Sequence, residues 1–319
     1  MKIGIIGTGA YGIALSSLFD LKNIELTMWT KLEDEFQELI NKKTNSKVLD
    51  YRLNDKIKYT MNIKEITNQS DVLILAIPAK FVKNIVLEIK KYYNNQHILI
   101  ATKGMVNDIL ISNLLKNELN TERIAYISGP SFASDIVKKE IIGLTLASNN
   151  VVTLDYFRCL FKDISYLKVE ITHDIIGAQL GGILKNIIAI GAGMLEGMHV
   201  SNSTKAKFLT DSSKEIKKII RDLDGNYKTF DTYSGIGDLF LTATSKESRN
   251  YTFGLLIGEN KDFQSYLENN TIEGMENLKN IKNLLNEKKI KSKLIDILFE
   301  IVYLNKSKEK ILEYLRNSN

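Results

Sequence analysis

The sequence is poor in cysteine and histidine, and this shortage excludes several kinds of site. Cys159 is the single cysteine among 319 residues, so an intramolecular disulfide and a cysteine-rich zinc site are both impossible. The three histidines, His97, His173 and His199, lack the spacing of a zinc site and have no cysteine partner. We therefore expect no metal site, and histidines that are structural or exposed.

The sequence also lacks the motifs of several other protein classes. It has no Gly-x-Ser-x-Gly elbow and no Gly-Lys-Ser/Thr phosphate loop, which argues against a hydrolase and a kinase. The net charge of +5 comes from 43 basic and 38 acidic residues without a dense basic block, so no nucleic-acid partner is expected. The apolar run after Met1 is too short for a signal peptide, which predicts a cytoplasmic protein.

Residues 175–195 are apolar over about the length of a bilayer span, but they include Gln179, Lys185 and Asn186. An amine at the centre of a membrane helix costs at least ~2.5–3.5 kcal/mol, so we expect a core helix and no membrane span. A lysine in the middle of a buried helix needs a partner or a chemical task. Lys185 is therefore the first candidate functional residue.

The first half of the chain alternates short β-branched runs with amphipathic stretches. The expected strands are residues 2–6, 24–29, 72–77, 98–101, 123–128 and 144–147, and the expected helices are residues 10–19, 33–41, 80–91 and 109–119. This alternation predicts an α/β fold, a Rossmann-like doubly wound and largely parallel sheet with helices on both faces.

The second half is predicted to be all-helical. After His173 the strand-like runs stop, and long helical periods follow at residues 203–223, 275–287 and 294–304. We place the boundary near residues 167–172. The prediction is a dinucleotide-binding domain over residues 1–170 and a helical substrate and catalytic domain over residues 171–319.

The first chemical motif is Gly7-Thr8-Gly9-Ala10-Tyr11-Gly12, which follows an expected strand and opens an expected helix. In such a motif the first glycine allows a tight turn, the second lets the backbone approach a pyrophosphate, and the third lets the helix pack on the strand. The motif and its position favour a dinucleotide site over an ordinary glycine-rich turn. The predicted cofactor-binding residues here are Gly7, Gly9, Ala10, Tyr11 and Gly12.

The end of the second strand bears on the choice of cofactor. An NAD site usually has Asp or Glu there to hold the ribose 2′-hydroxyl, but this strand ends Trp29-Thr30-Lys31. Lys31 could instead face a 2′-phosphate, so NADPH is favoured over NADH. In the alternative, Lys31 is a solvated surface lysine, and Glu33 or Asp34 bends back to the ribose.

Further motifs follow in a fixed order along the chain. They are Lys103-Gly104, Ser128-Gly129-Pro130-Ser131-Phe132-Ala133, Gly182-Ile183-Leu184-Lys185-Asn186, Gly235-Ile236-Gly237-Asp238-Leu239, Ser248-Arg249-Asn250 and Glu273-Gly274. In this order, behind a dinucleotide turn, they make the chain resemble NAD(P)-dependent glycerol-3-phosphate dehydrogenase of the bacterial type from end to end. Taken singly, a Lys-Gly or Glu-Gly pair carries no information.

The resemblance implies that Lys185 is the general acid and base at C2 of the substrate and that Asp238 is catalytic beside it. Reduction of a ketone needs a proton donor within hydrogen-bond reach of the carbonyl oxygen. A lysine suits this task because desolvation lowers the pKa of an ammonium group, which makes it a better acid. The alternatives are a structural lysine in a buried ion pair and, for Asp238 alone, a turn or helix-capping carboxylate.

The resemblance also implies the remaining site residues. The substrate, with its phosphate on the fork of Arg249, is expected at Lys103, Gly129, Ser131, Asn186, Thr242, Ser248, Arg249 and Asn250. The cofactor is expected to contact Lys31, Lys103, Ala133, Arg249 and Glu273 in addition to the glycine turn. Lys103 follows the carboxyl end of a strand, where open α/β sheets bind ligands. Gly129, Ser131 and Ala133 also follow a strand, and their small side chains let the backbone come close.

Several positions depart from the family pattern. Gln179 stands where a Glu is usual, Ser201-Asn202-Ser203-Thr204 replaces Gly-Asp-Asn-Thr, the loop that starts at Asn45 lacks Tyr-Leu-Pro-Gly, and Asp135 replaces a Glu. None of these changes removes Lys185, Asp238 or Arg249. If the substrate differs from that of the family, we expect the difference at Gln179 and Asn202.

Three functions remain open at this stage. The leading one is the interconversion of sn-glycerol 3-phosphate and dihydroxyacetone phosphate with NADPH or NADH, in the context of glycerophospholipid synthesis. The second is a related two-domain dehydrogenase that acts on another phosphorylated polyol or on a hydroxy acid, and the third is a nucleotide-sensing protein without turnover. A small phosphorylated substrate is expected. A homodimer is also expected, because apolar helical faces commonly form dimer interfaces.

Overall fold

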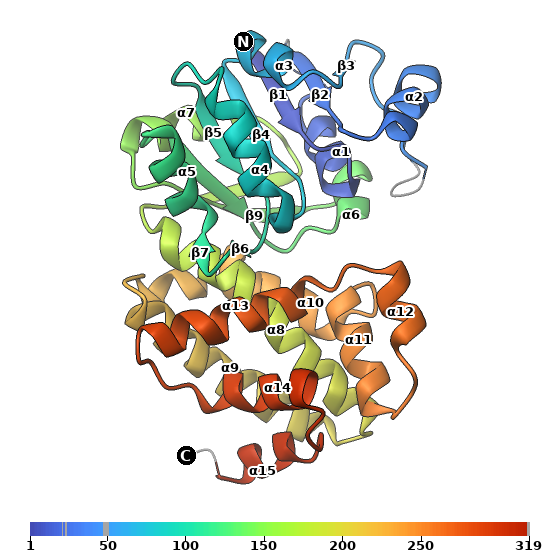
Figure 1. Ribbon diagram of the computed structural model, residues 1–319, viewed down its shortest axis with the longest axis vertical. Coiled ribbons are helices and arrows are strands. Elements are labelled where there is room, and N and C mark those ends of the chain that lie inside the picture. Colours follow the sequence, from blue (N-terminus) through green and yellow to red (C-terminus); the bar gives the residue numbers. More distant parts are fainter. Residues whose placement is uncertain (21, 23, 47–50, 318–319) are drawn as a thin grey trace. The chain divides into compact units, whose positions relative to one another are not determined.

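The computed structural model describes residues 1–317 apart from 21, 23 and 47–50. The chain divides into two compact units. The first, the sheet unit, comprises Met1–Val106 and Leu110–Ile175. The second, the helical unit, comprises Asn107–Ile109 and Ile176–Asn319. Figure 1 shows the strands in the first unit and the long helices in the second.

The sheet unit is built on one large sheet (Figure 1). In the described part of the chain it has eight strands in the order β10-β9-β8-β5-β4-β1-β2-β3. The strands are β1 (Lys2–Ile6), β2 (Glu25–Trp29), β3 (Lys58–Thr60), β4 (Val72–Leu75), β5 (His97–Ile100), β8 (Ile124–Ser128), β9 (Ile142–Ala147) and β10 (Leu167–Thr172). Neighbouring strands are parallel, except that β8 and β9 are antiparallel. The largely parallel sheet that the sequence predicted is confirmed.

Helices cover both faces of this sheet. They are α1 (Ala10–Ser17), α2 (Glu33–Lys42), α3 (Ile63–Gln69), α4 (Ala79–Lys90), α5 (Ile111–Leu119), α6 (Ala133–Val137) and α7 (Val151–Phe161). Right-handed crossovers place α1 and α2 on one face and α3, α4 and α5 on the other. The contacts agree, since α4 packs against α3 and α5 while α1 packs against α6. The central strand β4 is therefore buried along its whole length and reads as an unbroken apolar run.

The direction of the winding reverses at β1. The chain passes from β1 to β2 on one side, and later returns to β4 on the other side of β1. In open α/β sheets a ligand binds outside the carboxyl ends of the strands at such a reversal. The glycine turn at Gly7 follows β1 directly, and residues 76 and 77 follow β4. The topology thus places the motif at the edge where a ligand is expected.

The helical unit is arranged around the apolar helix α8 (Ile175–Gly197). The other elements are α9 (Asn202–Asp222), a 3₁₀ turn η1 (Tyr227–Asp231), a π-helical turn η2 (Tyr233–Gly237), α10 (Asp238–Thr244), α11 (Arg249–Gly258), α12 (Gln264–Asn269), α13 (Glu273–Glu287), α14 (Lys293–Leu304) and α15 (Lys310–Asn317). By length and composition α8 could cross a membrane, but 94% of its most apolar stretch is buried. The expectation of a core helix is confirmed.

Glycines let α8 and α11 approach each other closely. A Cβ atom on Gly193 would lie 2.0 Å from the carbonyl oxygen of Tyr251, and one on Gly254 would lie 2.0 Å from that of Ile190. Gly197 and Gly258, one turn further along each helix, have the same kind of contact. Larger residues would force the two backbones apart. The spacing between α8 and α11 is therefore fixed by backbone contact.

Two strands and the start of one helix differ from the sequence prediction. The edge strand β10 occupies the residues that were predicted as the boundary, and its side chains are half exposed, so it has no continuous apolar run. The strand β3 has three residues, which is too short for a periodicity signal. The helix predicted from residue 109 begins at Ile111, because residues 109 and 110 form β7 (Ile109–Leu110) with β6 (Met105–Val106).

Candidate functional site

The three glycines of the motif differ in what an added side chain would contact. Gly7 has a φ of +120°, and a Cβ there would lie 2.4 Å from the carbonyl oxygen of Ala76. A Cβ on Gly12 would lie 2.3 Å from the carbonyl oxygen of Gly7. A Cβ on Gly9, in contrast, would have no described atom within 4 Å. The fold itself therefore requires Gly7 and Gly12, but it does not require Gly9.

The open space at Gly9 fits a bound pyrophosphate. Gly9 is the N-cap residue of α1, and the free backbone N–H groups and the positive dipole end of a helix face outward at this position. An anion that approaches these groups must pass close to the Cα of Gly9, where a side chain would stand in the way. The residues present thus fit the cofactor that the motif predicts.

A second group of predicted residues lies beside this turn in the sheet unit. The Tyr11 hydroxyl is 3.2 Å from Ser131 Oγ, and Lys103 Nζ lies 6.0 Å from the centre of the Tyr11 ring. Ser131 Oγ also donates to the Gly129 carbonyl at 3.2 Å. Tyr11 on α1 therefore connects the glycine turn with the residues that follow β5 and β8.

Gly129 and Ala133 have clear roles in packing. A Cβ on Gly129 would lie 2.4 Å from the carbonyl oxygen of Gly143 at the start of β9, so the close approach that this glycine allows is to the neighbouring strand. Ala133 is the first residue of α6, the helix that packs against α1. Both positions were predicted as places where the backbone comes close to a ligand. For Gly129 the fold already supplies a sufficient reason.

In the helical unit, Lys185 contacts Asp238 and Thr242. Its Nζ lies 2.5 Å from Asp238 Oδ1 and donates to Thr242 Oγ1 at 2.8 Å. Relative exposures are 6% for Lys185, 1% for Asp238 and 3% for Thr242, so the ion pair is shielded from water. Asp238 and Thr242 are one turn apart on α10 and present their oxygens on the same face of that helix. An amine, a carboxylate and a hydroxyl are thus held within hydrogen-bond distance of one another.

The turn before α10 positions Asp238. The sequence predicted this aspartate in a glycine-rich turn, but it is the first residue of α10, directly after the π-helical turn Tyr233–Gly237. A Cβ on Gly235 would lie 2.2 Å from the carbonyl oxygen of Phe230, so this turn packs tightly on the segment before it. Single π-helical turns are frequent at functional sites. Here the turn directs the carboxylate toward α8.

A chain of amide hydrogen bonds links α8, α11 and α13. Asn250 Nδ2 donates to Asn186 Oδ1 at 2.9 Å, and the backbone N–H of Gly274 donates to Asn250 Oδ1 at 2.8 Å. Asn186 Nδ2 lies 3.4 Å from Glu273 Oε2. The oxygens of both asparagines are therefore engaged within the fold. Each side chain also retains an N–H group from which a ligand could accept a hydrogen bond.

Ser248 and Arg249 form the beginning of α11. Ser248 is the N-cap residue, and its Oγ accepts from the Tyr251 backbone N–H at 3.3 Å. Arg249 is the first helical residue and is exposed, so its guanidinium is accessible. A helix N-terminus that carries an arginine attracts anions. This arrangement suits a phosphate group, as the sequence predicted.

Tyr251 and Glu196 also connect α11 with α8. The buried phenol hydrogen-bonds the Glu196 carboxylate, and Glu196 also pairs with Lys205 Nζ at 2.6 Å. Burial and, next, the charge of Glu196 raise the pKa of Tyr251 to about 12, so it stays protonated at neutral pH. Lys205, followed by the Tyr251 hydrogen bond, lowers the pKa of Glu196. This contact holds α11 on α8 next to Asn250.

At the end of β2 the acidic residue that bends back is neither Glu33 nor Asp34. Lys31 is exposed, and its Nζ is 3.9 Å from Glu88 Oε1 on α4. Glu33 accepts a hydrogen bond from Gln37, and Asp34 is exposed. The acidic residue that bends back is Glu35. Its Oε2 accepts from Thr30 Oγ1 at 3.0 Å and, in a short hydrogen bond, from Thr8 Oγ1 of the glycine turn.

The positions that depart from the family pattern lie in ordinary structural settings. Gln179 is buried in α8. Ser201 caps α9 by accepting from the Thr204 backbone N–H at 3.2 Å, and Asn202 is exposed at the start of that helix. Asn45 is buried and donates to the Thr8 carbonyl at 3.1 Å, while residues 47–50 of its loop lie outside the described part. Asp135 lies in the first turn of α6.

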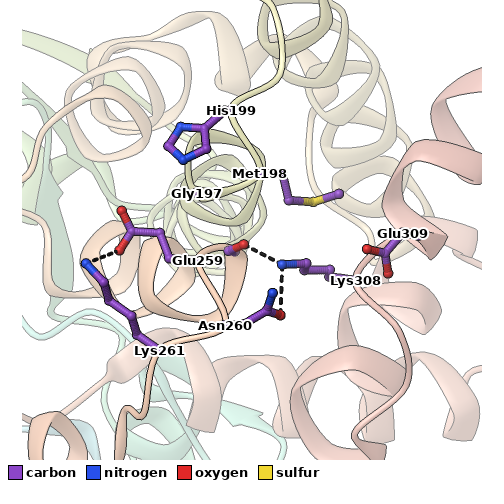
Figure 2. A pocket seen from close by; sticks show the side chains of 9 residues that line it. Gly197, Met198, His199, Glu259, Asn260, Lys261, Lys308 and Glu309 are labelled. Carbon is purple, nitrogen blue, oxygen red and sulfur yellow. Dashed lines mark hydrogen bonds and ion pairs between the residues drawn. The ribbon is translucent and has the colours of Figure 1, made fainter.

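Two further observations bear on what the site can be. Within the described residues no group of three or more His, Cys, Asp or Glu side chains could hold a metal ion. A pocket of about 600 Å³ lies in the helical unit, and Figure 2 shows the residues that line it. It lies at the C-terminal ends of α8 and α11, and Lys308 Nζ donates there to the Gly258 carbonyl and to Asn260 Oδ1. Twelve residues of α8, about 18 Å of helix, separate Gly197 in its wall from Lys185. This pocket therefore holds none of the predicted site residues.

Comparisons with known proteins give one consistent result. The family model for the N-terminal part of NAD-dependent glycerol-3-phosphate dehydrogenase matches residues 2–153, and the model for its C-terminal part matches residues 174–313. The chain is 31% identical to a glycerol-3-phosphate dehydrogenase (NAD(P)+) of Leptospira biflexa, over 99% of this chain and 97% of the relative. It is also 31% identical to one of Fusobacterium nucleatum, over 96% of this chain and 94% of that relative.

Solved structures agree with the sequence comparisons. A crystal structure of glycerol-3-phosphate dehydrogenase from Coxiella burnetii has a TM-score of 0.92 and 25% identity, covering 99% of this chain and 98% of the other. The Plasmodium falciparum glycerol-3-phosphate dehydrogenase has a TM-score of 0.88 and 21% identity, covering 100% of this chain and 96% of the other, and supports the fold alone. The α/β fold with a helical C-terminal part is thereby confirmed.

The glycine turn gives a testable prediction. Aspartate is a favourable N-cap residue, so Gly9→Asp keeps the thermal unfolding midpoint within a few degrees of wild type. Its carboxylate lies where the pyrophosphate would approach, so we expect cofactor affinity to fall at least ~100-fold, since like charges placed together cost several kcal/mol. Isothermal titration calorimetry and thermal unfolding measure the two effects.

Gly12→Ala is the matched control. Its Cβ would lie 2.3 Å from the Gly7 carbonyl oxygen, so the unfolding midpoint itself falls. If Gly9→Asp bound the cofactor as tightly as wild type, the assignment of Gly9 to the pyrophosphate would be wrong.

Proposed function

The chain belongs to the family of NAD-dependent glycerol-3-phosphate dehydrogenases, and on that premise we propose that it interconverts sn-glycerol 3-phosphate and dihydroxyacetone phosphate with NADH or NADPH. The observation that carries the proposal is the buried group formed by Lys185, Asp238 and Thr242. It places a proton donor in a water-poor environment with a carboxylate to keep it charged. The alternative of another hydroxy acid or polyol as substrate is not favoured, because the relatives reported above share one name.

The chemistry needs a hydride and a proton at one carbonyl group. When bound, the nicotinamide supplies the hydride to C2 of dihydroxyacetone phosphate. Lys185 Nζ donates a proton to the C2 oxygen as that oxygen gains negative charge, and in the reverse direction it takes the proton from the alcohol. Asp238 keeps Lys185 protonated before the transfer, because an opposite charge at 2.5 Å favours the ammonium form. Thr242 Oγ1 fixes the direction of the remaining N–H bonds.

The substrate phosphate is assigned to the beginning of α11. Arg249 offers a planar pair of donors, and Ser248, Asn250 and Asn186 each have one polar hydrogen with no acceptor recorded among the described residues. Lys103, Gly129 and Ser131 of the sheet unit are assigned to substrate binding on the family resemblance. The proposed cofactor contacts are Gly7, Gly9, Ala10, Tyr11, Gly12, Lys31, Lys103, Ala133, Arg249 and Glu273.

The setting of the enzyme is part of the same proposal. We assign residues 1–170 to cofactor binding and residues 171–319 to substrate binding and catalysis. We further propose a cytoplasmic homodimer that supplies glycerol 3-phosphate for glycerophospholipid synthesis. The family relationship supports this setting, and sedimentation of the purified protein measures the oligomeric state.

The role of Lys185 predicts the effect of removing its amine. Lys185→Met keeps the length and the apolar stem of the side chain. We expect kcat for dihydroxyacetone phosphate reduction, followed by cofactor absorbance at 340 nm, to fall by about 10²–10⁴-fold or more. Cofactor affinity should remain unchanged. Lys205→Met, which removes a lysine paired with Glu196 away from the proposed site, is the control. Retention of wild-type turnover by Lys185→Met would exclude this lysine as the acid.

The role of Arg249 predicts a change that depends on the phosphate. We expect Arg249→Met to raise KM for dihydroxyacetone phosphate by about 10–100-fold, the usual cost of a charge-assisted contact, and to impair the slow reduction of unphosphorylated dihydroxyacetone far less. The control is Arg221→Met, which removes an exposed arginine paired with Asp222 on α9. Equal losses with both substrates would show that Arg249 does not bind the phosphate.

A further inference from the structure

The carboxylate of Glu35 lies between the glycine turn and the end of β2. Its Oε2 accepts from Thr8 Oγ1 in the turn and from Thr30 Oγ1 directly after β2. In dinucleotide-binding folds an acidic side chain at the end of the second strand accepts a hydrogen bond from the 2′-hydroxyl of the adenosine ribose. Here the acidic group comes from the next helix, but its two hydrogen bonds fix it at the same junction.

Acidic side chains are concentrated around Glu35. It lies in the first turn of α2 together with Glu33 and Asp34, where the helix dipole stabilises negative charge. The N-cap residue, Leu32, has no side-chain acceptor. The negative charge at this end of α2 therefore comes from the three carboxylates of its first turn. A cofactor that carries a further phosphate would therefore approach a concentration of negative charge.

The two threonines cannot offset this charge. Each hydroxyl has one hydrogen, and both hydrogens are donated to Glu35. Thr30 Oγ1 in addition accepts from the Leu32 backbone N–H at 3.2 Å. Toward a bound nucleotide these hydroxyls can present only lone pairs. Lone pairs accept from a ribose hydroxyl, and they repel a phosphate.

Lys31 is the positive group that could bind a 2′-phosphate instead. Its Nζ is directed to Glu88 at 3.9 Å, and 71% of its side chain is exposed. Lys31 carries one positive charge, whereas the first turn of α2 carries three carboxylates. Because an exposed ammonium is well hydrated and screened, it offsets little of the repulsion from a hydrogen-bonded, half-buried carboxylate.

From this geometry we propose that Glu35 selects the cofactor, by accepting a hydrogen bond from the adenosine 2′-hydroxyl, and that the enzyme prefers NADH to NADPH. The inference rests on the proposed function, since it concerns the cofactor of that reaction. It differs from the expectation that Lys31 alone suggests. Glu35 is a specificity-determining residue in the sheet unit, separate from the proposed catalytic group in the helical unit.

Binding measurements on the full chain test this directly. Dissociation constants for NADH and NADPH are obtained by calorimetry and by quenching of the fluorescence of Trp29, the single tryptophan, which is buried at the end of β2. We expect wild type to bind NADH at least ~10-fold more tightly than NADPH. In Glu35→Gln, which keeps an acceptor for the threonines but loses the charge, this ratio should shrink about tenfold, mainly through tighter NADPH binding.

Two further variants separate the alternatives. Glu33→Gln removes an equal charge two residues earlier, from a side chain bonded to Gln37, and should leave the ratio within about twofold of wild type if direct contact matters. Lys31→Gln tests the competing assignment, and this variant should still bind NADH at least ~10-fold more tightly than NADPH if Glu35 sets the preference. Tighter wild-type binding of NADPH, lost in Lys31→Gln, would overturn the inference while supporting the proposed function. A folded protein that bound neither cofactor would overturn both.

Discussion

The pairing of Lys185 with Asp238 in the interior of the helical unit is the interaction on which the proposed chemistry depends. An isolated buried ammonium is costly, and it would lose its proton or pull water into the core. Asp238 Oδ1 at 2.5 Å and Thr242 Oγ1 at 2.8 Å remove this penalty. The same contacts keep the amine in one orientation. A lysine that would destabilise α8 by itself therefore becomes a positioned proton donor.

The rest of the helical unit holds this pair in place. Backbone contact through Gly193 and Gly254 sets the distance between α8 and α11, and the hydrogen bond between Tyr251 and Glu196 joins the same two helices. The amide chain from Asn186 through Asn250 to Gly274 adds the start of α13. Elements separated by many residues in the sequence thus share one rigid arrangement around Lys185. The beginning of α11, where we propose that the substrate phosphate binds, is held by the same contacts that hold α8.

The sequence predicted the parts of this account that depend on local pattern. The glycine turn after a buried strand, the alternation of strands and helices, and the buried lysine in an apolar helix each leave a periodic or spacing signal. Local pattern could not predict contacts made at a distance, such as the ion pair of Lys185 and Asp238, 53 residues apart, which only the resemblance suggested. The resemblance named both residues but gave no geometry. Nor could it tell which of three acidic residues at the start of α2 bends back, because that depends on the direction of each side chain from the helix. The strand β10 was missed since its half-exposed side chains give no apolar run.

The dependence of kcat on pH in wild type and in Asp238→Asn tests the central claim most directly. In the proposed mechanism the reduction of dihydroxyacetone phosphate requires protonated Lys185, so activity should fall as the pH rises through the pKa of this amine. Loss of the adjacent negative charge disfavours the ammonium form, and the alkaline limb should move to lower pH by at least about one unit. An unshifted limb, with only a uniform loss of kcat, would contradict the account.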